Sequence, residues 1–529
     1  MKLLKFFLVS TLILTSCHQE RPVDSRKPGW LYLNFSHEPS SHDIRKTTEH
    51  SAHHLSTMIL EGLMKINSEG IIEPAQAERV DVSNNGLTYT FHLRNCFWSD
   101  GTPVTAQDFA SSWLSCLHPQ TPSPNAYFFF CIKNAKAAHQ GLVSLDQVGI
   151  EVPNEKCLVV HLKYPINYFL EIMASPFASP IKYTPQASDY SSLLCNGPFK
   201  IQRWVHAQEI RLVKNPHYRC KDAIKLQGIR ISLVNEESTL IALFQDHQLD
   251  MIGPPFCHIS QSIQNGVFKP DNAYTLQGTL VSVCNFNTEK FPLNNIHFRK
   301  ALAYAIEKEQ LVDSMHMFHT RAAYSLLPET FIQHLHPAFR FCDSENAKEC
   351  LKLALEELNI QQDQLPKLKL TYPLSKEHDA IKNIVQILQH QWKQHLDLDI
   401  DLEALEIQQV TAKLGQRDYD IGFVSWAASY PSPFCYFERF LSKDTKKNYT
   451  GWENPQFISL IQNATNSTDN NSQAKYFLDA EKILASDMPI TPLIFWDYCL
   501  ITSNRVKGLK LCKTGNLCLE SLDITPPKN

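Results

Sequence analysis

Residues 98–109 read Trp-Ser-Asp-Gly-Thr-Pro-Val-Thr-Ala-Gln-Asp-Phe, and this stretch tells more about the fold than any other. Asp100 and Gly101 predict a turn, because aspartate hydrogen-bonds its own backbone and glycine tolerates unusual dihedral angles. Thr105 then begins a predicted helix, with Asp108 where a capping box usually has glutamate or glutamine. These residues build the fold, so we do not count them as a functional site.

Strands and helices alternate on both sides of this stretch. Runs with a period of two predict strands, and apolar residues at helical spacing predict helices. The predicted strands are residues 30–35, 88–93, 157–162, 199–204, 209–213, 369–372, 399–405 and 420–426, and further helices are predicted at 54–64, 298–309 and 379–396. The polar run 463–472 predicts an exposed loop. Because the order is irregular, we expect an α/β protein of several lobes rather than one barrel.

The N-terminal segment predicts export and lipidation. Lys2 and Lys5 precede a short apolar run that ends in Leu-Thr-Ser and Cys17. The pattern is typical of a secretory signal peptide, residues 1–16, cleaved in front of a lipid-carrying cysteine. The run is too short to cross about 30 Å of hydrocarbon as a helix. We therefore expect a cell-membrane lipoprotein that faces the periplasm; an ordinary signal peptide with an incidental cysteine is the alternative.

The amino-acid composition narrows the class of protein. The 529 residues are 43% hydrophobic and 20% charged, which is typical of a globular chain of several domains. The net charge of −4 argues against a nucleic-acid partner, because phosphate binding needs a basic surface. Fourteen of the fifteen cysteines follow Cys17 without a Cys-x-x-Cys pair, so no zinc ribbon is indicated. Some of them are free to pair in an oxidising compartment.

Motifs for catalysis are not found in the sequence. It contains neither a Gly-x-Ser-x-Gly nucleophile elbow nor a Gly-x-x-x-x-Gly-Lys phosphate loop. The string from His37 to His42 has one residue too many for a zincin, and Pro39 would disrupt the required helix. We expect a protein that is not an enzyme and has no cofactor. An envelope hydrolase is the rival from another class.

A histidine cluster leaves a second binding function open. Five histidines fall within 18 residues: His37, His42, His50, His53 and His54. Imidazole is a common ligand of zinc, nickel and copper. A metal-chelate or haem receptor is therefore the alternative function, and solvated or hydrogen-bonded histidines are the plainer interpretation.

A series of short strings, taken in order, resembles the oligopeptide-binding family of extracytoplasmic solute receptors that serve ABC importers (solute-binding family 5). The resemblance covers nearly all of the mature chain, and the string at 98–109 is its most specific part. The strings are Leu60-Glu61-Gly62-Leu63, residues 89–94, 98–109, Ser112-Trp113, Asn196-Gly197-Pro198-Phe199, Asn215-Pro216-His217-Tyr218, Leu249-Asp250 and residues 298–302.

The resemblance implies a two-lobed fold of the periplasmic-binding-protein type, in its class II, large three-domain form. Residues 17–64, 183–278 and 490–529 would form domain I, and residues 65–182 domain II. Domain III, residues 279–489, would form the second lobe. The two lobes would close about a hinge and enclose the ligand.

The resemblance also implies where the ligand binds. In the family an extended peptide pairs its main chain with a receptor segment that matches Trp426-Ala427-Ala428-Ser429-Tyr430. Such strand addition gives affinity that is independent of side chains. Trp426 and Tyr430 are then either pocket walls or packed core.

The chain departs from the family pattern at its charged anchors. An aspartate that pairs with the peptide's ammonium end is matched by Ser429, and a basic residue that helps to hold the far carboxylate falls at Phe423. His378 matches a histidine used in the same way, and Glu49 is a candidate replacement for the lost carboxylate. We expect a preference for ligands that are neutral or blocked at the amino end, such as cell-wall peptides. Ser429 as a tolerated change, with water and carbonyl groups holding the ammonium, is the alternative.

Together these features predict a monomeric, lipid-anchored receptor that carries peptides or peptide-like solutes to an ABC importer. Its expected partners are the ligand, the permease and ATPase subunits, and the membrane through the lipid at Cys17. More than one acyl chain is expected, because a single chain anchors weakly. A receptor that senses peptide without import remains open.

Overall fold

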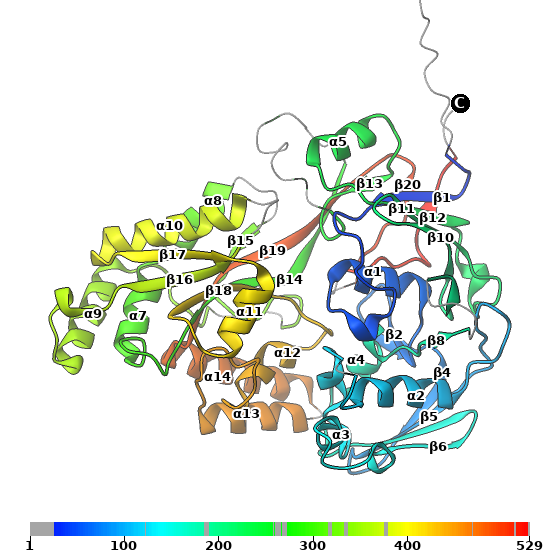
Figure 1. The fold of residues 1–529 in the computed structure, drawn as a ribbon, viewed down its shortest axis with the longest axis horizontal. Coiled ribbons are helices and arrows are strands. Elements are labelled where there is room, and N and C mark those ends of the chain that lie inside the picture. The colour runs from blue at the N-terminus through cyan, green and yellow to red at the C-terminus, as the bar shows by residue number, and fades with distance from the viewer. Residues whose placement is uncertain are drawn as a thin grey trace, which may run out of the picture.

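The computed structural model describes residues 26–121, 123–184, 190–257, 259, 266, 272–315, 320–332, 337–374, 379–467, 469–512 and 515–526. Cys17 and His378 lie outside the described residues. The chain folds into two lobes (Figure 1). We call the part that carries the two four-stranded sheets lobe 1, and the part built on the seven-stranded sheet lobe 2.

Lobe 1 contains two separate four-stranded sheets. The first has the order β1-β12-β11-β10, with β1 parallel to β12 (β1 Trp30–Asn34, β10 Phe199–Val205, β11 Glu209–Lys214, β12 Gly228–Ser232). The second is antiparallel, in the order β4-β5-β7-β6 (β4 Ala77–Val82, β5 Thr88–Leu93, β6 Ile150–Asn154, β7 Cys157–His161). The helices of lobe 1 are α1 His50–Ile59, α2 Ala106–Leu117, α3 Ala135–His139, α4 Phe169–Met173 and α5 Glu237–Gln245.

Lobe 2 is built on one mixed sheet of seven strands. Its order is β13-β19-β14-β18-β16-β17, and β15 pairs with β19 off this path (β13 Met251–Ile252, β14 Ala273–Phe286, β15 Thr320–Ala322, β16 Leu368–Pro373, β17 Ile400–Leu405, β18 Ile421–Trp426, β19 Ile490–Thr502). Its helices are α7 Ile296–Tyr304, α8 Lys308–Met315, α9 Ser344–Leu358, α10 Asp379–Leu396, α11 Ile407–Gly415, α12 Phe434–Phe437, α13 Pro455–Asn466 and α14 Asn470–Asp487. Short two-stranded ladders complete the chain: β2 Met64–Ile66 with β3 Ile72–Pro74, β8 Lys182–Tyr183 with β9 Leu193–Leu194, and β20 Val506–Lys507 with β21 Asp523–Ile524.

The two lobes are joined by the long antiparallel strands β14 and β19, which run from one to the other (Figure 1). Their register shifts between Leu276 and Leu280. At Gly278 within this bulge, a Cβ atom would lie 1.9 Å from the carbonyl oxygen of Trp496, so only glycine fits without movement of the backbone. The bulge lies at the predicted seam near Thr279, but the domain boundaries themselves stay predictions.

Residues 98–109 form the predicted turn and the start of the predicted helix. Gly101 has a φ of +87°, which favours glycine. The Thr105 N–H donates to Asp108 Oδ2 (2.9 Å), and the two residues complete a capping box at the start of α2. The buried Trp98 indole donates to the same carboxylate oxygen (3.2 Å). Asp108 therefore ties the turn to the helix.

Three of the strings that carried the resemblance meet at one buried carboxylate. Glu61 accepts two hydrogen bonds from the Arg219 guanidinium (2.8 Å each) and one from the Tyr218 hydroxyl (2.8 Å). The Asn196 amide pairs with the Glu61 backbone in both directions. Such a closed network specifies a single arrangement of distant segments. Its residues are therefore structural.

Three sequence predictions of local structure are corrected by the fold. Residues 463–472 are not a loop: α13 extends to Asn466, and α14 begins at Asn470 after the Asp469 side chain caps it. The predicted helix 298–309 is two helices, because the chain breaks after Tyr304. The predicted helix 54–64 lies earlier, at 50–59, since Leu60 adopts an extended conformation.

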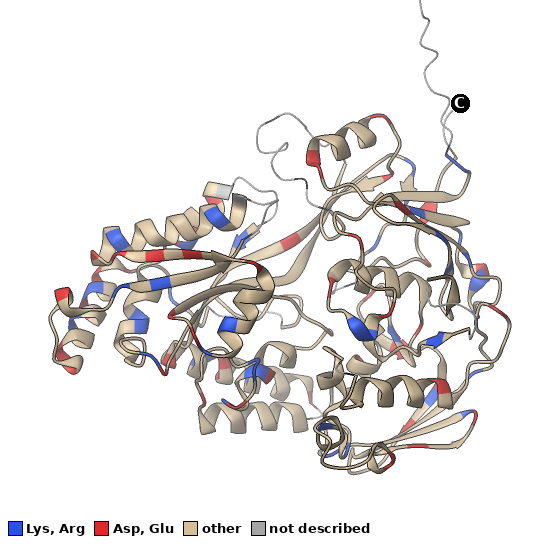
Figure 2. Cartoon of the chain, in the orientation of Figure 1, with Lys and Arg blue, Asp and Glu red and all other residues tan. Residues whose placement is uncertain are grey.

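Charged side chains (Figure 2) and free thiols are spread over both lobes in the described residues. Basic and acidic side chains are interspersed over both lobes (Figure 2). Free thiols occur in both lobes, at Cys131 and Cys435 for example. No helix in the described part of the chain combines the length and the hydropathy needed to cross a membrane.

Candidate functional site

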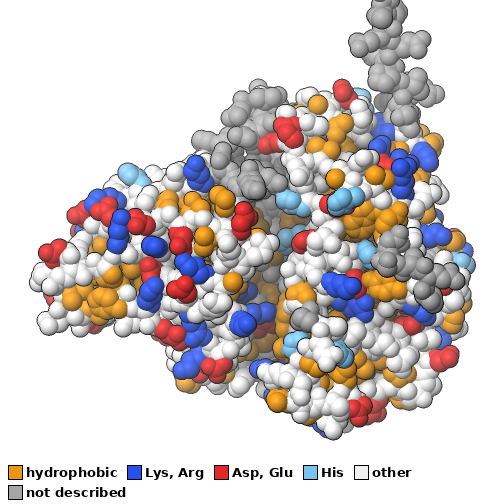
Figure 3. All heavy atoms as spheres, in the orientation of Figure 1, with side chains coloured by type: hydrophobic (Ala, Val, Ile, Leu, Met, Phe, Trp, Pro, Cys, Tyr) orange, Lys and Arg blue, Asp and Glu red, His pale blue; other side chains and the backbone are white. Residues whose placement is uncertain are grey.

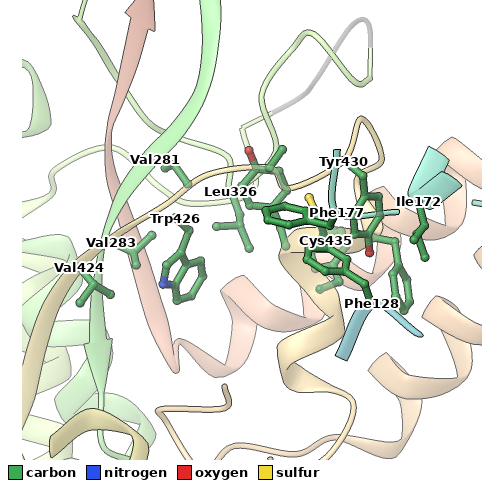
Figure 4. Close-up of a cluster of buried hydrophobic side chains, with 14 of the residues drawn as sticks. Phe128, Ile172, Phe177, Val281, Val283, Leu326, Val424, Trp426, Tyr430 and Cys435 are labelled. Carbon is green, nitrogen blue, oxygen red and sulfur yellow. The ribbon is translucent and has the colours of Figure 1, made fainter. Parts of the chain in front are cut away.

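The segment 426–430 leaves the end of β18 and crosses toward lobe 1. Trp426 is 5% exposed and packs among Val281, Val283 and Val424 (Figure 4). The Arg439 guanidinium lies over the Trp426 ring, 3.8 Å from its centroid. Trp426 is therefore a packed side chain that supports the segment from the lobe-2 side.

Tyr430 reaches into lobe 1. Its ring stacks on Tyr168 (centroids 5.8 Å apart) and meets Phe128 edge-on (6.2 Å), and Figure 4 shows it beside Phe177 and Ile172. Its hydroxyl donates to Glu438 Oε2 of its own lobe (3.2 Å). The aromatic rings thus form a contact between the lobes at one end of the segment.

A small pocket of about 140 Å³ lies between the lobes beside this contact. Lobe 2 contributes Ser429, Tyr430 and Pro431, while lobe 1 contributes residues of α1 and of the segments 60–68, 174–179 and 512–520. Figure 3 shows the face between the lobes as a hollow, with histidine side chains along its lobe-1 side. The structure therefore places Ser429 and Tyr430 in a cleft.

The carboxylates that line this pocket are already paired. Glu61 is held by Arg219, and Glu520 lies 2.6 Å from the Lys65 ammonium group. Among the described lining residues, no other acidic side chain is present. An ammonium group in the pocket would therefore have to compete with an existing ion pair.

The backbone at the centre of the segment has unused hydrogen-bonding capacity. Within the described part of the chain, the N–H and C=O groups of Ala427 and Ala428 make no hydrogen bond to another residue. Buried backbone groups are almost always paired, and Ala428 is only 9% exposed. The segment thus offers two residues of free main chain next to Ser429.

Three of the five clustered histidines, His50, His53 and His54, lie on α1. His53 and His54 share Asn516: its Oδ1 is 2.8 Å from His54 Nδ1, and its Nδ2 is 3.1 Å from His53 Nε2. Burial lowers the pKa of His53 to about 3 and the pKa of His54 well below its usual value. Among the described residues, none of the five histidines belongs to a group with metal-binding geometry. Their arrangement gives no support to the metal or haem alternative.

Two of the remaining predicted site residues, Phe423 and Glu49, do not line the pocket. Phe423 is fully buried in β18, opposite Cys284 of β14. Glu49 is exposed before α1, where its carboxylate accepts the Ser40 N–H (2.8 Å). His378 lies outside the described residues, so its role and those of Phe423 and Glu49 stay predictions.

Arg439 is a candidate that the sequence did not indicate. Besides its contact with Trp426, it makes no ion pair among the described residues, and its Nε is a buried donor without an acceptor. Trp426 Nε1 is a second such donor. No pattern near residue 439 distinguishes this arginine; only the fold brings it to Trp426.

A comparison with family models identifies the family of the chain. The model of the bacterial extracellular solute-binding proteins, family 5 (middle part), matches residues 72–448. The chain belongs to this family. The family 5 resemblance drawn from the sequence is thus confirmed, and so is the two-lobed α/β fold of the periplasmic-binding type.

Individual family 5 proteins align along most of the chain. The oligopeptide-binding protein OppA of Bacillus subtilis is 32% identical over 96% of both chains. The periplasmic murein peptide-binding protein MppA of Escherichia coli is 26% identical, over 88% of this chain and 87% of its own. The crystal structure of Haemophilus influenzae OppA with the peptide RPPGFSPFR matches with a TM-score of 0.78, covering 95% of this chain and 100% of that one. At 22% identity, the last comparison shows the fold alone.

Proposed function

We propose that this family 5 protein binds oligopeptides or peptide-like solutes in the cleft at Ser429 and delivers them to an ABC importer. The observation that carries the proposal is the free main chain of Ala427 and Ala428. An extended peptide can satisfy these groups by strand addition, whatever its side chains are. OppA and MppA, named for peptide ligands, are consistent with this choice.

The same cleft supports a preference at the ligand's amino end. Ser429 carries no charge, and the nearby carboxylates are paired within lobe 1. Leaving one member of a buried charge pair without its partner typically costs about 2–5 kcal/mol. Ligands that are neutral or blocked at that end, cell-wall peptides among them, are therefore favoured over peptides with a free ammonium group.

Isothermal titration of the mature protein tests both parts of this function. We expect tripeptides to bind, and the N-acetylated form to bind at least as tightly as the free amine. N-methylation of the ligand amides that pair with 427–428 should weaken binding about tenfold or more, because it removes a donor. If N-methylation at every position is harmless, or no peptide binds, strand addition at this segment is wrong.

We also propose that a lipid on Cys17 anchors the receptor to the cell membrane, facing the periplasm. The short apolar run before Cys17 and the family 5 membership support this placement. Replacing Cys17 with serine should move the protein from the membrane fraction to the soluble fraction. Retention of the variant in the membrane fraction would contradict lipid anchoring at this residue.

A further inference from the structure

Three chemically different side chains converge in lobe 2, away from the ligand pocket. Glu307 lies between α7 and α8, Cys342 lies just before α9, and His395 lies in the last turn of α10. One carboxylate oxygen, the thiol sulfur and one imidazole nitrogen all lie within 4.8 Å of one another. In Figure 1, α9 and α10 lie on the side of lobe 2 that faces away from lobe 1.

The fold holds Glu307 through both its side chain and its main chain. His395 Nε2 lies 2.8 Å from Glu307 Oε1. Gln391, one turn earlier on α10 and 1% exposed, accepts the Glu307 N–H with its side-chain oxygen (3.1 Å) and donates to the Glu307 carbonyl (3.3 Å). Glu307 is therefore positioned by both its main chain and its side chain, and His395 by its contact with Glu307 on α10.

The cysteine is positioned by its neighbour. The Asp343 N–H donates to the Tyr304 carbonyl at the end of α7 (2.9 Å), and its carboxylate caps α9 by accepting the Asn346 N–H (3.0 Å). Cys342 also lines an open surface hollow of about 550 Å³. The backbone beside Cys342 is thus fixed, and the half-buried thiol borders a surface hollow.

We propose that Glu307, Cys342 and His395 bind a zinc ion. Thiolate, imidazole and carboxylate are the ligands that zinc takes in proteins, in tetrahedral geometry at about 2.0–2.3 Å. A thiolate, a carboxylate and a neutral imidazole balance the charge of the ion. Water or a side chain from another molecule supplies the fourth ligand. The ion would link the α7–α8 connection, α9 and α10.

Cobalt is the probe, because a thiolate bound to Co²⁺ gives a charge-transfer absorption band that a solvated ion lacks. We expect the mature protein to take up one equivalent of Co²⁺ with this band, and one equivalent of Zn²⁺ to displace it. C342S should abolish the band, and H395N should weaken Co²⁺ binding at least tenfold. C157S and H390N are the matched controls: Cys157 is a half-buried thiol in lobe 1, and His390 is an exposed histidine on the same helix.

The proposal is overturned if the wild-type protein shows no band. It is also overturned if the C342S protein keeps the full band, or if C157S and H390N reduce it as much as the cluster variants do. Thermal melts establish that each variant is folded. Should C342S not fold, H395N and E307Q decide the question, because both leave the thiol in place and remove one ligand.

Discussion

Replacing Ser429 with aspartate should restore a charged anchor for the amino end of a peptide. Opposite unit charges 4 Å apart attract by about 4 kcal/mol at an effective dielectric constant of 20. The carboxylates of Glu61 and Glu520 are paired within lobe 1, so the new aspartate meets no free competitor for the ammonium. Allowing half of the attraction for desolvation leaves about 2 kcal/mol, or about thirtyfold in Kd.

The assay is a thermodynamic cycle measured by isothermal titration. Wild-type protein and S429D are each titrated with a tripeptide and with its N-acetylated form. The ratio of the two Kd values should change about thirtyfold in favour of the free amine in S429D. S429N is the control, because asparagine matches aspartate in size without its charge. A change of less than threefold, or an equal change in S429N, would refute the placement of the ligand's amino end beside Ser429.

The remaining predictions concern the buried acid Glu481, the bulge at Gly278 and Arg439. Burial raises the pKa of Glu481 to about 7. The protonated carboxyl therefore contributes stability that is fully present below about pH 4.5, the pKa in the unfolded chain, and is lost as pH rises through 7. The free energy of unfolding should fall by about 3 kcal/mol over this range. E481Q should remove that share of the pH dependence in urea unfolding between pH 5 and 8; an unchanged slope would contradict it. G278A should lower Tm by several degrees, because its methyl group would lie 1.9 Å from the Trp496 carbonyl, and an unaltered Tm would show that the bulge yields freely. Because its Nε is a buried donor without an acceptor among the described residues, Arg439 is a candidate for holding the carboxylate of a peptide ligand. R439Q should then lower the affinity for peptides with a free carboxyl end about tenfold more than for their amides. Equal losses would rule out this role.

Much of the fold could be predicted because the signals are local. The helix α10 has the predicted bounds, 379–396, since its apolar face repeats over five turns, and α2 begins after Thr105 because the capping residues are adjacent in sequence. The prediction of a loop at 463–472 was wrong, because asparagine and serine are as suitable for the exposed ends of two helices as for a loop. Only packing of α13 against α14 decides between them.

The site could be predicted in part for a similar reason. The resemblance pointed to the segment that carries Ser429, and the structure places it in a cleft. Arg439 could not be found, because its distinguishing property among the described residues is a buried Nε without an acceptor, which no local sequence pattern expresses. Asn516 lies more than 450 positions from His53 and His54, so the sequence could not show that it hydrogen-bonds both. These contacts explain two of the clustered histidines without a metal.

The return of the C-terminal segment to lobe 1 has a consequence for biogenesis. The residues around Asn516 line the pocket together with α1, so they join lobe 1 after both of its four-stranded sheets have been synthesised. A nascent chain therefore cannot complete lobe 1 until the segment around Asn516 has been made. Contacts of such long sequence separation slow folding. During that interval the apolar faces of the lobe-1 strands stay exposed, so we expect folding in the cell to depend on chaperones.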